Sequence, residues 1–342
     1  MRSTFRRRWL RRPSTRLRTR VGAQVFGALA CFGLGVAAVH AYGGRGATEL
    51  ARAVPLSAPE AVIVVREGRR GLIDAGGHFV ALAEYRRIVS TSPVADSLLL
   101  ALVEPDRIRA ISSHGAQNSA FAYRYAGFER IDGRAAPEAI LALEPDLLLV
   151  HGRGGSDRID RLREAGIAVF DLGSMLGLET LEPNLRAVGA LVGRPERGAT
   201  LARRFRARMQ RVASGLPATH RPPGALYLAI YDGKLYGGTR GSSYHDILRY
   251  AGLEDLAAVD FEGWPRFDPE IVLRMDPEVI VTHESMGAAI CAAPGLGGLR
   301  PCRGQGRFVE LPSGLANLPS LDLLEATERV FETVYDDEAF RP

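Results

Sequence analysis

Apolar positions along most of the chain follow the two periods that mark strands and helices. Short runs of strand-forming residues alternate with segments whose apolar residues lie three or four positions apart. In chain order these segments are 87–90 (strand), 96–103 (helix), 107–112 (strand), 137–143 (helix), 147–150 (strand), 157–165 (helix) and 168–172 (strand). The order resumes with 225–230 (strand), 244–251 (helix), 269–275 (helix), 279–283 (strand), 307–311 (strand) and 321–335 (helix). This alternation predicts the α/β class, with parallel sheets covered by helices.

One helix–strand unit of this pattern occurs twice. Residues 137–151 read PEAILALEPDLLLVH, and residues 269–283 read PEIVLRMDPEVIVTH. The copies begin 132 positions apart, which is too far for a short solenoid repeat. We therefore expect two related lobes.

The residues within this unit suit a short helix that packs on a sheet. Proline fits the first helical position, and Asp268 stands where its side chain can cap the second helix. The apolar residues expected to face the sheet are Ile140, Leu143, Val272 and Met275. Glu138 and Glu270 lie in the first turn on the outer side, where the positive helix end favours a carboxylate. On residue chemistry alone, these glutamates are expected to stabilise the helices.

An amphipathic helix is predicted between the two lobes. In RPERGATLARRFRARMQRVASG, arginines surround an apolar stripe made of Leu201, Phe205, Met209 and Val212. Gly215 and Pro217 then stop the helix. Twenty helical residues span about 30 Å, so we expect a single helix to cross from one lobe to the other.

The first forty-one residues have the composition of an export signal. Residues 1–20 contain nine arginines and no acid, and residues 21–41 carry no charge. Val39, His40 and Ala41 end the apolar run with the spacing of a cleavage site. We expect a cleaved signal peptide and a periplasmic protein. The alternative is an uncleaved anchor, because 21 apolar residues can span a bilayer. RRRWLR at 6–11 also resembles a twin-arginine signal.

Charge beyond this leader argues against a nucleic-acid partner. The whole chain has a formal net charge of +5, and the nine arginines of the leader leave −4 for the rest. No basic excess therefore remains in the part that folds. Hydrophobic residues make up 46% of the chain, which is enough for two cores.

The cysteines indicate one disulfide. Cys31 lies in the apolar leader, whereas Cys291 and Cys302 bound the stretch CAAPGLGGLRPC. In an exported protein such a pair predicts a disulfide bond. The alternative is half of a metal site that lacks its other two ligands.

These patterns divide the chain into five parts. They are 1–41 (signal peptide or N-terminal anchor), 42–84 (extension with a hairpin at 61–82), 85–194 (N-terminal lobe), 195–216 (linker helix) and 217–342 (C-terminal lobe).

Six stretches match, in order, the pattern of one known family. They are RRIVSTSP (86–93), PEAILALEPDLLLV (137–150), LREAGIAVFDL (162–172), GTRGSSYHDILRYAGLEDLAA (238–258), GWPRFDPEIVLRMDPEVIV (263–281) and GRFVELPSGLANLPSLDLLEATERV (306–330). From Tyr85 onward the chain resembles the periplasmic substrate-binding proteins of ABC importers for ferric siderophores, haem and cobalamin. The resemblance implies the class III architecture: two Rossmann-like lobes bridged by one long helix, a ligand between them and no catalysis.

The resemblance also implies partners and a ligand class. In relatives, one surface glutamate on each lobe meets arginines of the two permease subunits, and the matching positions here are Glu138 and Glu270. An ABC permease dimer with its ATPase is the implied partner. The implied ligand is a metal chelate, and no intrinsic cofactor is expected.

Several loops depart from the family pattern. Residues 92–97 read SPVADS where SPS-x-TE is usual, and residues 103–105 read VEP in place of a glycine-rich turn. The loop at 112–128 is also unlike the common pattern. Because these loops help to form the ligand wall, the identity of the ligand does not carry over from any relative.

The carboxyl ends of the strands indicate where a ligand would bind, because they face the crevice in open α/β sheets. The residues expected there from the first lobe are Ser90, Ser92, His114, His151 and Gly152. Those from the second lobe are Tyr231, Tyr236, Arg240, Trp264 and His283. Aromatic side chains suit a flat or greasy chelate, arginine suits an anionic one, and a neutral imidazole can ligate haem iron.

Each of these residues also has a simpler interpretation. His114, His151 and His283 are either hydrogen-bonding loop residues or a three-histidine site for a bare metal ion. Trp264 either lines the cleft or covers the core, and Arg240 either binds an anion or is a solvated loop residue.

Two other function classes compete with transport. Gly152 and Gly154 follow a strand, and Asp171 ends the next one, as in a dinucleotide-binding oxidoreductase. The third glycine of that fingerprint is replaced by Asp157, which disfavours a pyrophosphate. The other class is a sensing or partner-binding module on the same fold.

Overall fold

The computed structural model describes residues 63–114, 122–152, 156–216, 221–312, 314–315 and 320–335. The expected leader and its cleavage site lie outside these ranges. Within them, no helix combines the length and the apolar character that crossing a bilayer requires.

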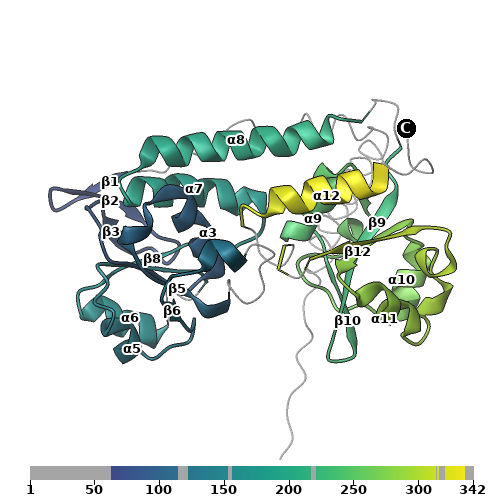
Figure 1. Ribbon diagram of the computed structural model, residues 1–342, viewed down its shortest axis with the longest axis horizontal. Helices are drawn as coiled ribbons and strands as arrows, with labels where there is room; N and C mark the ends of the chain where they lie inside the picture. The colour runs from purple at the N-terminus through teal and green to yellow at the C-terminus, as the bar shows by residue number, and fades with distance from the viewer. Residues whose placement is uncertain are drawn as a thin grey trace, which may run out of the picture. The chain divides into compact units, whose positions relative to one another are not determined.

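The N-terminal lobe is built on a five-stranded parallel sheet (Figure 1). Its strand order is β6-β5-β4-β7-β8. The strands are β4 (Ile88–Ser90), β5 (Ile108–Ser112), β6 (Arg130–Ile131), β7 (Leu147–Val150) and β8 (Ala168–Asp171). The α-helices are α3 (Pro93–Leu102), α5 (Pro137–Leu141), α6 (Asp157–Glu164) and α7 (Leu178–Leu191), with 3-10 turns η1 (Pro105–Arg107) and η2 (Ala122–Tyr125). The helix expected at 96–103 begins earlier, because Pro93 takes the first position and the Ser92 hydroxyl accepts from Ala95 N.

The C-terminal lobe has a mixed sheet of order β10-β9-β12-β13, with β11 also paired to β9. The strands are β9 (Gly224–Tyr231), β10 (Lys234–Gly238), β11 (Glu254–Asp255), β12 (Val279–His283) and β13 (Arg307–Leu311). The helices are α9 (Ser243–Tyr250), α10 (Pro269–Met275), α11 (Met286–Ala292) and α12 (Leu323–Tyr335), with 3-10 turns η3 (Leu256–Val259), η4 (Leu296–Gly298) and η5 (Pro301–Arg303). The α/β class with parallel central sheets is confirmed.

Strand β10 is an addition that the sequence pattern did not predict. It pairs antiparallel with β9 through a tight turn at Asp232 and Gly233, whose φ angles are 49° and 68°. Positive φ at both central residues is the backbone form that suits a two-residue hairpin.

The segment before the first lobe forms a three-stranded antiparallel sheet. It comprises β1 (Val64–Arg66), β2 (Arg69–Ile73) and β3 (Phe79–Ala81), in the order β1-β2-β3. The expected two-stranded hairpin therefore has a third strand. Leu72 and Val80 are buried, so one face of this small sheet packs against the lobe.

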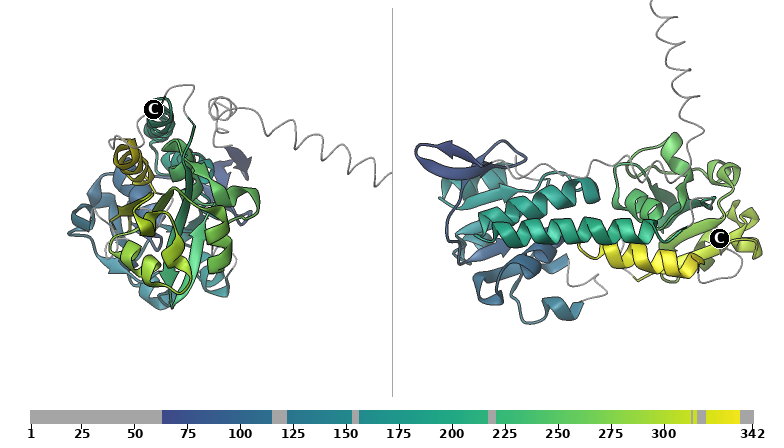
Figure 2. Two further views of the ribbon diagram at one scale, coloured as in Figure 1. Left: turned by 90° about the vertical axis from the view of Figure 1, so that its right-hand side faces the viewer. Right: turned by 90° about the horizontal axis from the view of Figure 1, so that it is seen from above.

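Helix α8 (Pro195–Ala213) is the single helix between the lobes (Figures 1 and 2). It packs on α7 of the first lobe and on α9 and α12 of the second. A buried ion pair joins Arg206 to Glu182 of α7 at 2.6 Å, and Arg208 pairs with Glu328 of α12 at 2.8 Å. Gly198 lies so close to α7 that a Cβ there would stand 2.5 Å from the Leu185 carbonyl oxygen.

The repeated unit adopts the same structure in both lobes. Its strand pairs in parallel with the first strand of its lobe, Ile88 opposite Leu147 in one and Ala225 opposite Val279 in the other. The acidic residue before the second proline has a left-handed backbone conformation in both copies, with a φ angle of 49° at Glu144 and 47° at Asp276. The two chain segments are therefore structural equivalents.

The prediction that the Asp268 side chain caps the helix of the second copy was wrong. Asp268 occupies the N-cap position of α10, but its side chain makes no capping hydrogen bond. The N–H of Ile271 donates to the backbone carbonyl of Asp268 at 3.0 Å, so it does not need the carboxylate.

The disulfide between Cys291 and Cys302 is confirmed, with the two Cα atoms 5.4 Å apart. Cys291 lies in α11 and Cys302 in η5, so the bond ties a helix to a turn before β13.

Removing this bond should destabilise the C-terminal lobe. A closed loop of this size stabilises a fold by about 3 kcal/mol in the chain-entropy model. We expect a Cys291→Ala/Cys302→Ala chain starting at residue 42 to unfold at correspondingly lower denaturant concentration. Thiol titration of the unfolded, unreduced wild-type chain from residue 42 should find no free thiol, and two thiols would contradict the bond.

Candidate ligand-binding site

An aromatic cluster lies at the carboxyl ends of β9 and β12. These strands are parallel, with Tyr227 opposite Val281. Side chains alternate between the faces of a strand, so Tyr227 and Tyr231 share one face with His283 of the neighbouring strand.

The imidazole of His283 bonds to both tyrosines. Its Nε2 lies 2.6 Å from the Tyr227 hydroxyl and 3.0 Å from the Tyr231 hydroxyl. Burial lowers the pKa of His283, so the ring is neutral near pH 7. Its Nδ1 is buried and has no hydrogen-bond partner among the described residues.

Two further rings extend the cluster from the second lobe's loops and helices. Tyr244, in the first turn of α9, stacks on Tyr227 with ring centroids 3.6 Å apart. Trp264 meets Tyr244 edge to face at 4.8 Å. Gly238 permits this packing, because a Cβ there would lie 2.3 Å from the Tyr244 ring.

The outer members of the cluster are open to solvent. Tyr231 is 42% exposed and Trp264 is 45% exposed, whereas Tyr227 and Tyr244 are buried beneath them. Tyr236 on β10 adds a ring 6.2 Å from that of Tyr231. Buried aromatic residues thus support an exposed aromatic surface that a ligand can contact.

Burial also keeps the phenols of this cluster neutral. It raises the pKa of Tyr227, Tyr231 and Tyr244 above the ordinary value of tyrosine. At neutral pH these hydroxyls therefore act as hydrogen-bond donors and acceptors.

Arg240 lies in the turn after β10 and is exposed. Its Nε approaches the Phe261 carbonyl at the limiting distance of 3.5 Å, and it forms no ion pair with a described residue. The guanidinium can therefore pair with an anionic group of a ligand.

The serines expected at the end of β4 lie inside the first lobe. Ser90 and Ser92 are fully buried. The Ser90 hydroxyl donates to the Ser92 carbonyl at 2.9 Å, and the Ser92 hydroxyl caps α3. The Ser92 hydroxyl serves the local backbone, whereas the Ser90 hydroxyl contacts both the Ser92 carbonyl and the Asp96 carboxyl.

Asp96 lies beneath these serines without any exposure to solvent. Both of its carboxylate oxygens lie 3.2 Å from Ser112 N, at the end of β5. Burial raises the pKa of Asp96 to about 8, and hydrogen bonds from Ser90 and Ser112 oppose the shift only partly. The carboxyl is therefore largely protonated at neutral pH.

The three histidines at strand ends do not form one metal centre. His114 is exposed after β5, His151 is half-buried after β7, and His283 bonds to tyrosines. No group of three or more His, Cys, Asp or Glu side chains in the described part of the chain is arranged to hold a metal ion.

Glu138 and Glu270 are exposed in the first turns of α5 and α10. The apolar residues beside them, Ile140 and Val272, are buried against their sheets. Each glutamate therefore lies on the outer side of its helix.

Four residues predicted from the sequence, Tyr231, Tyr236, Trp264 and His283, lie together in the structure, whereas Tyr227 and Tyr244 were not predicted. The spacing of Tyr227 and Tyr231 was a usable signal, because residues four apart share a strand face. Tyr244 left no such signal, since only the fold stacks α9 against β9.

Comparison with known proteins agrees with this architecture. The family model described as "Periplasmic binding protein" matches residues 88–306, which is more than half of the chain. The chain belongs to this family.

Relatives of this periplasmic binding protein include a cobalamin-binding protein of Halobacterium salinarum. The two are 25% identical over 62% of this chain, and the match spans 58% of the relative's length. A haem-binding protein of Roseiflexus sp. RS-1 has 20% identity and a TM-score of 0.63, covering 72% of this chain and 98% of that one. The vitamin B12-binding protein of Vibrio cholerae has 24% identity and a TM-score of 0.59, covering 72% and 96%. The class III fold is confirmed by these structures.

The dinucleotide-binding alternative is not supported by the geometry of Asp171. In that fingerprint the acidic side chain reaches for a ribose. Here its carboxylate accepts hydrogen bonds from Gly152 N and Gly173 N in its own lobe.

The stability of this periplasmic binding protein should depend on pH through Asp96. Only the unfolded chain releases this proton between about pH 4 and pH 8, so the free energy of unfolding should fall as pH rises through that window. Asp96→Asn should remove this part of the fall, a few kcal/mol at about 1.4 kcal/mol per pKa unit. Urea unfolding at pH 4–9 checks it, with the exposed Asp106→Asn as control. Parallel profiles for wild type and Asp96→Asn would contradict it.

Proposed function

We propose that this protein captures a metal chelate, such as haem, cobalamin or a ferric siderophore, between its lobes and delivers it to an ABC permease. The observation that carries the proposal is the solvent-open aromatic surface of Tyr231 and Trp264, built on the buried pair Tyr227–His283. Its position at the carboxyl ends of β9 and β12 is where open α/β sheets bind ligands.

The chemistry of the surface favours a chelate over a bare ion. A bare zinc ion needs three or four nitrogen, sulfur or oxygen ligands that converge at about 2.1–2.3 Å. The aromatic cluster and the turn beside it offer rings, the guanidinium of Arg240 and the single imidazole of His283 instead. Rings suit a macrocycle or an aromatic siderophore, and Arg240 suits its carboxylates. The names of the similar cobalamin- and haem-binding proteins support the same ligand class.

Contacts between the lobes favour a modest closure around the ligand. The buried carboxylate of Asp246 in α9 accepts from Leu178 N, the first residue of α7, at 2.6 Å. Arg124 of η2 forms an ion pair at 3.0 Å with Asp322, the residue before α12. Together with α8, these links leave little freedom for a large hinge motion.

Ligand binding should depend on the exposed aromatic residues. We expect calorimetric or absorbance titration with haemin, cyanocobalamin, ferric siderophores and free Zn²⁺ to find a chelate that binds. Trp264→Ala should weaken that binding about ten- to hundredfold, because a buried ring contributes about 1.5–3 kcal/mol.

Val259→Ala serves as the matched control, since Val259 is 80% exposed in η3 and outside the cluster. Tight binding of free Zn²⁺ with no chelate bound would refute the chelate hypothesis.

Delivery should depend on Glu138 and Glu270, which we propose as the permease-docking residues. A Glu138→Arg/Glu270→Arg variant should lose uptake in cells, because each arginine would meet an arginine of the permease. Its affinity for the chelate should remain within about twofold of wild type, since both residues lie on outer helix faces.

Glu196→Arg/Glu332→Arg is the control, with one exposed glutamate changed in α8 and one in α12. Uptake at the wild-type rate by the Glu138→Arg/Glu270→Arg variant would contradict the docking role and leave these glutamates only the stabilisation of their helices.

A further inference from the structure

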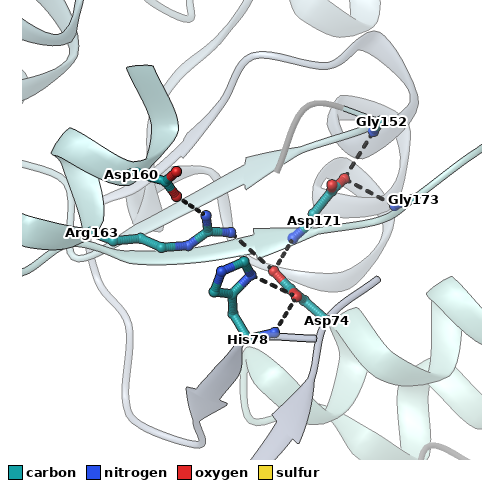
Figure 3. Close-up of polar contacts among 7 residues, drawn as sticks. All are labelled: Asp74, His78, Gly152, Asp160, Arg163, Asp171 and Gly173. Atoms are coloured by element: carbon teal, nitrogen blue, oxygen red, sulfur yellow. Dashed lines mark hydrogen bonds and ion pairs between the residues drawn. The ribbon is translucent and has the colours of Figure 1, made fainter. Parts of the chain in front are cut away.

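The turn between β2 and β3 reaches the carboxyl end of β8 (Figure 3). Asp74 in this turn has no exposed side-chain surface. One of its oxygens accepts from His78 N at 2.7 Å, within the turn. The other accepts from Asp171 N at 3.2 Å and from the Arg163 guanidinium at 3.2 Å. A single carboxylate thus joins the small N-terminal sheet to the lobe.

The same turn binds both backbone polar groups of Asp171 at the free edge of β8. While Asp171 N donates to the Asp74 carboxylate, the Asp171 carbonyl accepts from Ala75 N at 3.1 Å. Strand β8 is an edge strand of its sheet, so the turn takes the place of the missing neighbour. With its backbone held in this way, Asp171 has a fixed direction for its side chain.

The carboxylate of Asp171 accepts hydrogen bonds from the beginning of the loops that follow two strands. Its Oδ1 accepts from Gly152 N, two residues beyond β7, at 2.8 Å and from Gly173 N, two residues beyond β8, at 3.0 Å. Both glycines have positive φ, 60° and 73°. A Cβ on Gly173 would lie 2.7 Å from the Cβ of Ala75, so the turn also packs directly on one of these loops.

The arrangement depends on all of its members, because buried carboxylates need partners. Arg163 provides the positive charge, shared between Asp74 and Asp160 at 3.2 and 2.9 Å. Backbone N–H groups donate to both oxygens of Asp74 and to Oδ1 of Asp171. Removing Asp74 would therefore remove two hydrogen bonds that hold the turn on Asp171 and β8, and would free Asp171 to release Gly152 and Gly173.

We propose that the β1–β3 sheet is a positioning element of the ligand site, with Asp74 acting through Asp171 to fix the backbone at Gly152 and Gly173, just beyond β7 and β8. The proposal rests on the proposed function, because these two glycines matter for the ligand only if it binds at the carboxyl ends of the strands. The extension precedes residues 88–306, the part that matches the family model. Asp74 itself does not touch the ligand.

The test compares Asp74→Ala with Asp146→Ala. The Asp146 carboxylate accepts from Arg86 N and Arg87 N, at 2.8 and 2.9 Å, at the opposite end of β7. Each change removes a carboxylate that accepts from two backbone N–H groups. They differ in the end of the sheet that they release, so loss of stability alone does not distinguish them.

Two quantities are measured in each variant, alongside its free energy of unfolding in urea. The first is amide hydrogen exchange at Gly152 and Gly173 in the unliganded protein. The second is the Kd for haemin and for cyanocobalamin. In Asp74→Ala, exchange at both glycines should accelerate, and the Kd of the bound probe should rise, each about tenfold. In Asp146→Ala, the exchange rates at both glycines and the Kd should stay within about twofold of wild type.

The outcomes separate this proposal from the function on which it rests. Unchanged exchange at Gly152 and Gly173 in Asp74→Ala, or equal changes in both variants, would overturn it. If wild type binds neither probe, the proposed ligand class fails for these two compounds and the exchange measurement alone decides about the turn. If Asp74→Ala does not fold, Asp74→Asn, which keeps the volume and one acceptor oxygen, should show the same changes at smaller size.

Discussion

Parallel pairing between the first strand of each lobe and the strand of the repeated unit determines where the functional groups lie. In the second lobe this is the pairing of β9 with β12. The register fixes which side chains share a face, and a shift of one strand by one residue would place Tyr227 and Tyr231 on the opposite face of the sheet from His283. The hydrogen bonds of both tyrosines to one imidazole nitrogen depend on that register. The exposed aromatic surface above them depends on it in turn.

Buried carboxylates connect segments that are distant in the sequence. Asp74 binds the β2–β3 turn to β8, Asp96 binds α3 to β5, and Asp246 binds α9 to the beginning of α7. In each contact the carboxyl group accepts a hydrogen bond from a backbone N–H. Such a bond is stronger when the acceptor is charged. Asp96 differs because burial outweighs its hydrogen bonds and keeps its proton on. These contacts stabilise loops and helix ends that have little apolar surface of their own.

The two lobes share the repeated unit but differ in the chemistry of their strand ends. Ser90 and Tyr227 occupy matching positions, opposite Leu149 and Val281. The first is buried with its hydroxyl used by the backbone, and the second anchors an aromatic cluster. The common framework therefore gives both lobes the same outer helix with an exposed glutamate, while the inner ends are free to differ.

The sequence by itself determined the elements whose signals are local. Periodicity and proline and glycine positions placed the repeated units, helix α8 and most strands, and the cysteine pair predicted its disulfide. Helix α7 escaped detection, because it contains Pro183 and its contact with α8 relies on Gly189 and Gly198. The cap expected from Asp268 also failed, since a backbone carbonyl met the N–H first.

Only the tertiary structure decided which of the expected site residues act together. It buried Ser90 and Ser92, separated the three histidines, and added Tyr227 and Tyr244 to the aromatic cluster. It also revealed the link from Asp74 to Asp171, which are 97 residues apart in the chain. Such contacts leave no periodic trace in a sequence, because they depend on strand register and on the edge at which a sheet ends.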